Sequence, residues 1–417
     1  MQFSAKYTIF VGHSEPCTTR LTTQTITYVQ AMKIAFSHNA FPCGGAERVT
    51  LDIAKYMTQN IPGCRFYVFA YKIMEELCTE EVRRYITIIK VSSDRHKRCE
   101  EIAQHILNEG IGVLIQAVKP LADIEAIRKK TGVKVVFANH GEPFWEQYTI
   151  AQKYSKKRIL KPLWRPILRR CIEDWGIARS VAIKRVKRNY LNADAYTVLC
   201  EEYKLEVCKA LGIIPEESHI VAIENSEAIV TDVNYDKEKV ILFCGRLVNV
   251  SKRLDRMLRI WGRVQHKLPD YRLVIVGDGE YRKAMEQQIA QEGLERVEMV
   301  GQRTDVDTFY RKASIVALTS QYEGWGLCLT EGQAHGCIPI AFGCSAGVRT
   351  ILSPSGTYGF IIEPYDEEAY AEALLHIAAM SDEERSTIRH NVVAKSANYA
   401  PHIIMQKWAD LIGSLLK

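Results

Sequence analysis

Short apolar runs rich in valine and isoleucine alternate along the chain with longer amphipathic stretches. The short runs have the length and composition of buried strands, and the longer ones have the apolar spacing of helices. Such alternation predicts parallel sheets covered by helices. The expected strands are Lys33–Ser37, Phe66–Ala70, Ile86–Val91, Val113–Gln116, Val133–Phe137, Ala195–Leu199, Val240–Cys244, Arg272–Val276, Val297–Val300, Ile315–Leu318 and Ile338–Ala341.

So many strands are improbable in a single sheet, and the strand pattern lapses between Ile229 and Lys239. We therefore predict an α/β protein of two doubly wound, Rossmann-like domains that face a central cleft. The domains should comprise residues 32–230 and 231–398, and residues 399–417 should form a helix that packs back across them. The threonine-rich residues 1–31 have no clear period, so we expect an extension that is disordered or not native.

The composition agrees with a folded, soluble protein. Of the 417 residues, 47% are hydrophobic and 25% charged, which excludes disordered, collagen-like and coiled-coil classes. The twelve cysteines form no C-x2-C pair, and H-E-x-x-H is absent, so we expect reduced thiols rather than disulfides or a zinc site. No apolar run is long enough to span a membrane, and the N-terminus lacks the pattern of a signal peptide. We therefore expect a cytoplasmic location.

The net charge of +6 is unevenly distributed, because thirteen basic residues but only two acidic ones fall between Ala151 and Tyr190. Apolar residues recur between these cations near helical spacing, a pattern typical of helices at a membrane interface. This segment is predicted to dock on the anionic inner face of the plasma membrane or on an acceptor; alternatively its apolar side packs on the domain while the cations face water. The cations chosen for this surface are Lys156, Lys157, Arg158, Arg169 and Arg170.

A glycine pair follows the first expected strand, in the run F-P-C-G-G-A-E-R-V. Gly44 and Gly45 would let a phosphate approach backbone N–H groups at a helix N-terminus, where the helix dipole favours an anion. The alternative is a tight strand-to-helix turn with no ligand.

The second domain opens with I-L-F-C-G-R-L, which places Arg246 at the carboxyl end of a strand and Lys252 six residues later. Ligands of open parallel sheets bind at that edge, and two cations there suit a diphosphate. A pair of solvated loop cations is the alternative. The later turn Val276–Glu280 is interpreted as structural.

The densest signal is S-Q-Y-E-G-W-G-L-C-L-T-E-G-Q-A-H-G-C-I-P-I, which follows the strand at Ile315–Leu318. Glu323 lies in the loop, Gly324 and Gly326 permit close backbone approach, and Glu331 falls about one turn into the next helix. Two carboxylates near a helix N-terminus suit a polyhydroxylated, phosphate-bearing ligand. Alternatively, Glu331 is a residue of the helix surface.

These motifs resemble the retaining glycosyltransferases of family 4, which have the GT-B fold. The resemblance begins at Met32 and is most specific at E-x7-E, followed by A-x-G-x-x-P at Ala334, Gly336 and Pro339. It implies a donor site made of Glu323 by the donor sugar, Glu331 on the nucleotide ribose, Arg246 and Lys252 on the diphosphate, Gly44 and Gly45 closing over it, Gln302 and Arg303 beside the base, His140 near the transferred sugar, and the loop residues Gly324, Trp325, Gly326 and Leu327.

The sequence departs from the family pattern at three places. Arg253 stands where a glycine is frequent, Ser226 where proline or glycine is usual, and Thr350 where many members have an acidic residue. None belongs to the E-x7-E pair, so they bear on donor selectivity rather than on the reaction class.

The resemblance implies transfer of a hexosyl unit from a nucleoside-diphosphate sugar, with a leaning to UDP, to a carbohydrate or lipid-linked saccharide in surface polysaccharide synthesis. No cofactor or metal is expected, because Asp305–Asp307 begins a helix instead of following a strand. A nucleotide-sugar epimerase or hydrolase of the same fold is the alternative. A non-enzymatic binder of anionic polymers is less favoured and nucleic acid is not expected, since the basic segment lacks closely interleaved aromatic residues.

Overall fold

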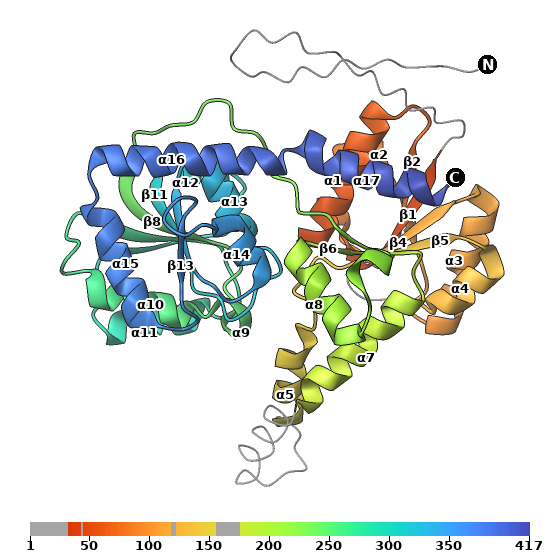
Figure 1. The fold of residues 1–417 in the computed structure, drawn as a ribbon, viewed down its shortest axis with the longest axis horizontal. Helices are drawn as coiled ribbons and strands as arrows, with labels where there is room; N and C mark the ends of the chain where they lie inside the picture. Colours follow the sequence, from red (N-terminus) through yellow and green to blue (C-terminus); the bar gives the residue numbers. More distant parts are fainter. Residues whose placement is uncertain (1–31, 43–44, 118–121, 156–175) are drawn as a thin grey trace.

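The computed structural model describes residues 32–42, 45–117, 122–155 and 176–417. The described residues form two parallel sheets, and Figure 1 shows them in two domains that lie side by side with helices around each sheet. The first sheet has seven strands in the order β3-β2-β1-β4-β5-β6-β7, and the second has six in the order β10-β9-β8-β11-β12-β13. The prediction of two doubly wound domains is thus confirmed.

All eleven expected strands are present, several of them longer by a few residues. Two strands of three residues each, β7 and β13, were not expected. The strands are β1 (Lys33–Phe41), β2 (Arg65–Ile73), β3 (Ile86–Lys90), β4 (Val113–Ala117), β5 (Lys134–Ala138), β6 (Ala195–Val198), β7 (Ile220–Ala222), β8 (Glu238–Cys244), β9 (Arg272–Val276), β10 (Val297–Gly301), β11 (Ala313–Leu318), β12 (Ile338–Phe342) and β13 (Phe360–Ile362).

Capping residues fix many of the helix ends. Ser381 and Glu384 form a capping box at the start of the longest helix that crosses the second domain, and Gly110 ends a first-domain helix in the left-handed conformation. The helices are α1 (Gly45–Asn60), α2 (Glu80–Tyr85), α3 (Arg95–Glu109), α4 (Ile124–Thr131), α5 (Glu146–Ser155), α7 (Ile177–Leu191), α8 (Glu201–Leu211), α9 (Asn249–Lys252), α10 (Leu254–Val264), α11 (Arg282–Gln291), α12 (Val306–Lys312), α13 (Leu327–Ala334), α14 (Ala346–Leu352), α15 (Glu367–Ala379), α16 (Asp382–Ser396) and α17 (Pro401–Leu415).

The last helix returns to the first domain. Figure 1 shows α16 along the second domain and α17 continuing across to lie beside α1. Its apolar side chains Ile404, Met405, Trp408 and Ile412 are buried in the same cluster as Ile34 of β1. The C-terminal helix therefore completes the core of the first domain.

The strand order places a switch point in each sheet. β1 lies between β2 and β4, and β8 lies between β9 and β11, so the connections leave these central strands in opposite directions. Ligands of open parallel sheets bind at the carboxyl ends of strands at such points. The loops after β8 and β11, and α1 after β1, are therefore the places to look for a site.

Candidate active site

The loop between β11 and α13 holds Glu323 in a defined position. Its Oε1 accepts a hydrogen bond from Lys252 Nζ at 2.5 Å and another from Ser320 Oγ at 2.6 Å. Burial alone would lower the pKa of Lys252, but the charge and hydrogen bond of Glu323 outweigh that effect and raise it. Two residues selected from separate motifs are thus brought into direct contact, as a charged pair.

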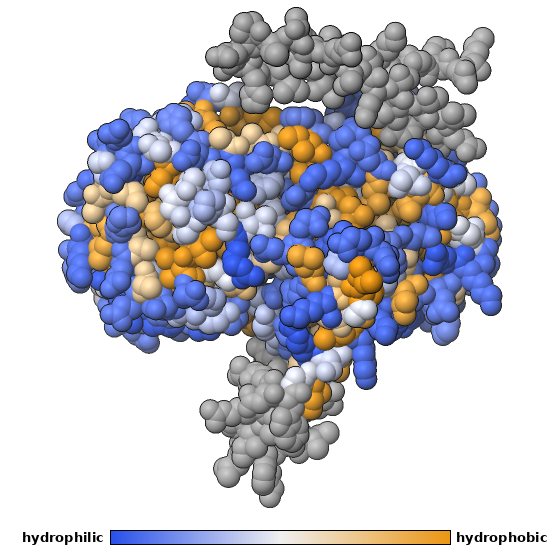
Figure 2. Space-filling view, viewed as in Figure 1, coloured by the Kyte–Doolittle hydropathy of each residue, from blue (hydrophilic) through white to orange (hydrophobic). Residues whose placement is uncertain are grey.

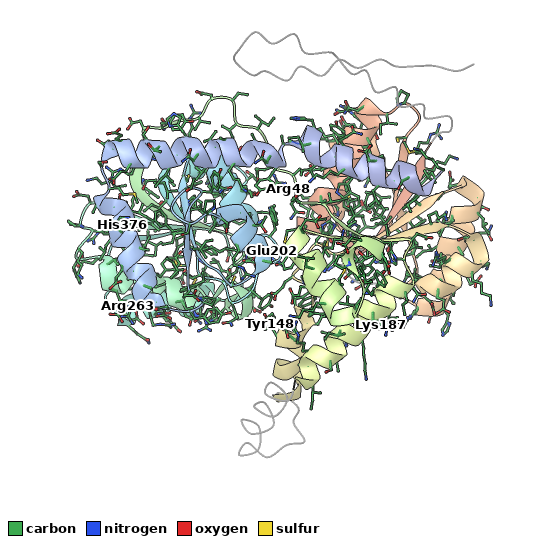
Figure 3. The ribbon with its side chains drawn as sticks, viewed as in Figure 1. Arg48, Tyr148, Lys187, Glu202, Arg263 and His376 are labelled. Atoms are coloured by element: carbon green, nitrogen blue, oxygen red, sulfur yellow. The ribbon has the colours of Figure 1, made fainter. Side chains whose placement is uncertain are left out.

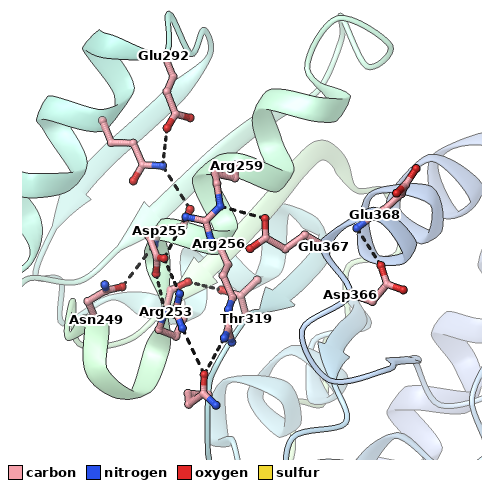
Figure 4. A network of polar contacts seen from close by, with 12 residues as sticks. Asn249, Arg253, Asp255, Arg256, Arg259, Glu292, Thr319, Asp366, Glu367 and Glu368 are labelled. Atoms are coloured by element: carbon pink, nitrogen blue, oxygen red, sulfur yellow. Dashed lines mark hydrogen bonds and ion pairs between the residues drawn. The ribbon is translucent and has the colours of Figure 1, made fainter. Parts of the chain in front are cut away.

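Arg253 forms the turn that directly follows Lys252. Lys252 ends the short helix α9, and Arg253 then takes a left-handed backbone with φ of 47° before α10 begins. This conformation is costly for residues other than glycine. The Arg253 side chain donates two hydrogen bonds to Asp255, at 2.9 and 2.8 Å, and these fix the turn (Figure 4). An arginine at this position is therefore compatible with the turn.

Glu331 is contacted from both domains. Its Oε2 accepts a hydrogen bond of 2.7 Å from the Tyr310 hydroxyl, and its Oε1 lies 3.0 Å from Nη1 of Arg48 on α1. Burial opposes the charge of Arg48, but the carboxylates of Glu331 and Glu227 raise its pKa. Figure 3 places Arg48 where the two domains meet. Glu331 therefore makes a contact between the two domains and is not a free residue of the helix surface.

Glu227 lies in the connection between the sheets, next to this pair. It is buried, and its Oε2 accepts a hydrogen bond of 2.9 Å from Thr330. Burial and the nearby Glu331 carboxylate raise the pKa of Glu227 to about 7. The region around Glu331 therefore contains a second carboxyl group that is partly protonated at neutral pH.

The loops after β8 and β9 pack closely on each other. A side chain at Gly277 would collide with the carbonyl oxygen of Gly245, and one at Gly279 with that of Leu247. This agrees with the structural interpretation of the V-G-D-G-E turn. The packing supports the loop that carries Arg246, whose side chain is exposed and whose positive charge acts on Lys252.

The remaining donor-site candidates of the second domain lie in different surroundings. Trp325 is buried and packs edge-on against Tyr399, with ring centroids 5.3 Å apart. Gly326 has φ of 91° at the start of α13, and the Leu327 side chain approaches Gly45 of α1. Gln302 and Arg303 are exposed after β10, where Arg303 pairs with Asp305 at 2.8 Å.

Several selected residues lie outside the described part of the chain. They are Gly44, Lys156, Lys157, Arg158, Arg169 and Arg170.

His140 reaches the interface from the first domain, in the loop after β5. Its Nδ1 is buried and has no hydrogen-bond partner among the described residues. Burial and the neighbouring His38 lower the pKa of His140 to about 4, so the ring is neutral at physiological pH. A side chain at Gly324 would lie 2.7 Å from the His140 carbonyl oxygen, so the two loops touch through their backbones.

Arg246 and Lys252 offer cations for a diphosphate, and Glu323 and Glu331 offer carboxylates for hydroxyl groups.

In the described part of the chain, no cluster of three or more histidine, cysteine and acidic residues could hold a metal ion. Within the same residues, none of the helices has the length and apolar character needed to cross a bilayer.

Comparison with known proteins defines the class of the second domain. Residues 226–392 match the model of the family described as "Glycosyl transferases group 1". This part of the chain is thus similar to the group 1 glycosyltransferases, and the two domains together have the GT-B fold.

The relatives found are glycosyltransferases. The amylovoran biosynthesis glycosyltransferase AmsD of Erwinia amylovora is 29% identical over 57% of this chain and 63% of its own length. A Campylobacter jejuni α-1,4-N-acetyl-D-galactosaminyltransferase, named for an acceptor linked to undecaprenol by a diphosphate, is 24% identical over 92% of this chain and 99% of its own. Anabaena HepE in complex with UDP-glucose superposes with a TM-score of 0.69 at 19% identity, covering 92% of this chain and all of that one.

Sequence reasoning missed several residues of the site. Arg48, Tyr310 and Glu227 all contact or surround Glu331, yet none was selected. Arg48 lies within the quoted run F-P-C-G-G-A-E-R-V, so its place at the start of α1 was a usable signal. Tyr310 and Glu227 carry no motif of their own.

Proposed function

We propose that this protein is a retaining glycosyltransferase that moves a hexosyl unit from a UDP-sugar to a saccharide or lipid-linked saccharide acceptor. The observation that carries the proposal is the arrangement of Lys252, Glu323 and Glu331 at the carboxyl edge of the second sheet. These groups suit the diphosphate, sugar and ribose of such a donor. The GT-B fold and the group 1 family match support the same class of reaction.

The chemistry needs a stable leaving group. When the bond between the anomeric carbon and the phosphate oxygen breaks, negative charge grows on the departing diphosphate. Cations fixed at that point stabilise the transition state more than the ground state. Glu323 already holds Lys252, and Arg246 lies in the same connection after β8. We therefore assign the leaving diphosphate to these two residues.

Our proposal includes retention of the anomeric configuration, in one step and without a covalent intermediate. In our proposal the acceptor oxygen attacks from the face that the phosphate leaves, and the departing phosphate takes the hydroxyl proton. A covalent route would need an ionised carboxylate nucleophile. Burial raises the pKa of Glu142, the buried carboxyl of the His140 loop, to about 8, so this group is mostly protonated at neutral pH and is a poor nucleophile.

Two features support the donor and acceptor classes. UDP-glucose is bound in the HepE structure, and the Campylobacter relative is named for a lipid-linked acceptor. We further propose peripheral docking on an anionic membrane from the cytoplasmic side. Exposed cations on α7, among them Lys184, Lys187 and Arg188, support this. Figure 2 shows hydrophilic residues interspersed with apolar patches on the face in view.

A panel of sugar nucleotides tests the proposal. The correct donor should raise the unfolding temperature of the protein, because a ligand at 100 times its dissociation constant adds roughly 2.7 kcal/mol of stability. The same donor should be consumed rapidly only when an acceptor is present. Rapid turnover without acceptor would instead identify an epimerase or a hydrolase.

A further inference from the structure

Tyr203 of the first domain holds the loop that carries Glu323. Tyr203 lies on α8 and is only 1% exposed. Its hydroxyl oxygen lies 3.0 Å from the carbonyl oxygen of Glu323 and 3.0 Å from that of Gly324, so one hydroxyl proton is shared between the two acceptors. The contact spans 120 residues of sequence and crosses from one domain to the other.

The second domain bonds the Glu323 carboxylate, whereas the first domain supplies a side-chain hydrogen bond to the backbone beside it. Lys252 and Ser320 both bond the carboxylate, and both belong to the second domain. Among the described residues, the only side-chain hydrogen bonds to the carbonyl groups of Glu323 and Gly324 come from Tyr203. The first domain therefore adds a hydrogen bond to this loop that the described side chains of the second domain do not supply.

Close backbone packing makes this loop sensitive to the domain arrangement. Added side-chain carbons at Gly324 and Gly347 show the fit: the first would lie 2.8 Å from Cα of Gly141, and the second 2.3 Å from the carbonyl oxygen of Gly324. Gly324 is thus enclosed between the His140–Gly141 turn of the first domain and α14 of the second. A shift of one domain would move the loop.

A second contact lies beside the first. The rings of Tyr148 on α5 and Tyr322 stack across the interface, with centroids 4.7 Å apart and planes at 6°. Figure 3 shows Tyr148 on the side of the first domain that faces the second. The stack keeps the domains together on that side, but it contacts the ring of Tyr322 and not the Glu323 backbone.

We propose that Tyr203 is a positioning residue for transfer, which couples closure of the domains to the placement of Glu323. The inference rests on the proposed function, since it gives Glu323 its role beside the donor sugar. The Tyr203 hydroxyl bonds the backbone carbonyl groups beside the Glu323 carboxylate and not the carboxylate itself. Its loss should therefore lower the rate of the chemical step while leaving donor binding largely intact.

Tyr203→Phe removes the hydroxyl and keeps the ring. We expect kcat to fall about tenfold, the effect of losing one net hydrogen bond from the transition-state arrangement, with a change in donor KM below about twofold. Amide hydrogen exchange in Ser320–Leu327 should become several-fold faster. Tyr67→Phe is the matched control, because Tyr67 is also buried in the first domain and its hydroxyl donates to Glu109 at 2.9 Å.

Two results would overturn the inference. One is an unchanged kcat in Tyr203→Phe. The other is exchange that accelerates throughout the protein, or a rate loss that Tyr67→Phe matches, since either would mean a general structural role. Turnover by the unaltered protein tests the proposed function, whereas the exchange comparison reports on the loop whether or not turnover is seen.

Discussion

Arg48 and Glu331 join the two domains through an ion pair of 3.0 Å between residues 283 positions apart in the chain. The Arg48 side chain is half exposed, whereas that of Glu331 is only 17% exposed. Both carboxylate oxygens of Glu331 already have a donor, Arg48 on one and Tyr310 on the other. A nucleotide ribose that binds Glu331 must therefore share these oxygens or displace Arg48.

Glu331→Gln should raise the donor KM about tenfold with little change in stability. The amide keeps the size of the side chain but removes a charged acceptor, and a charged hydrogen bond contributes roughly this much to binding. Steady-state kinetics with the best donor measures the effect. Glu81→Gln, which breaks the exposed pair with Lys55, is the control. A wild-type KM would mean that Glu331 does not hold the donor.

Arg246→Ala should lower kcat on the order of a hundredfold, since it removes a cation assigned to the leaving diphosphate. The residue is exposed and fills no core, so the unfolding temperature should change little. Arg263→Ala, an exposed arginine on α10 labelled in Figure 3, should keep the normal rate. Equal rates for the two variants would show that the diphosphate binds elsewhere.

Stability should fall as pH rises, in part because of Glu142. Burial raises its pKa from 4.5 to about 8, so folding takes up a proton between these values. The stability that the protonated group retains is complete below pH 4.5 and is lost as pH approaches 8.

Glu142→Gln should remove that part of the pH dependence. The amide can still accept the 3.1 Å hydrogen bond from Tyr148. We expect a flatter curve of unfolding temperature against pH, with a gain on the order of a few kcal/mol at pH 8. Glu125→Gln, at an exposed site on α4, should leave the curve unchanged. Parallel curves for Glu142→Gln and the unaltered protein would contradict the assignment.

Binding to anionic vesicles should be strong at low salt and weak at high salt. Each cation near an anionic surface contributes roughly 1 kcal/mol, and salt screens that attraction. Sedimentation with vesicles measures it, and neutral vesicles are the control. Binding should be lost when these five residues become glutamine: Lys156, Lys157, Arg158, Arg169 and Arg170. Failure to pellet at low salt would favour a soluble acceptor.

The fold could be predicted because most of its strands are visible as short apolar runs in the sequence. Runs such as Ile338–Ala341 are apolar on both faces, as a strand buried between helix layers must be. The missed strands β7 and β13 have three residues each, too few to show a pattern. They are strands because they extend existing sheets beside β6 and β12, which is information from pairing and not from composition.

The site was predictable only where chemistry follows a strand. Recognisable runs after β8 and β11 contain Arg246, Lys252 and Glu323. The contact between Lys252 and Glu323 agrees with the proposal that both belong to the donor site. The contributions of Tyr203 and Tyr310 to the site depend on partners distant in the sequence. A buried tyrosine is interpreted as a core residue until the acceptor of its hydroxyl is known. Domain contacts of this kind leave no local pattern.

The return of α17 to the first domain has a consequence for how the protein is made. β1 and α1 leave the ribosome long before α17 does. The apolar side chains that α17 packs beside them, including Trp408 and Ile412, are synthesised only after the whole second domain. Until then the first domain carries an uncovered apolar face, the kind of surface that promotes aggregation of partly folded chains. Maturation of the nascent first half thus depends on completing the second half.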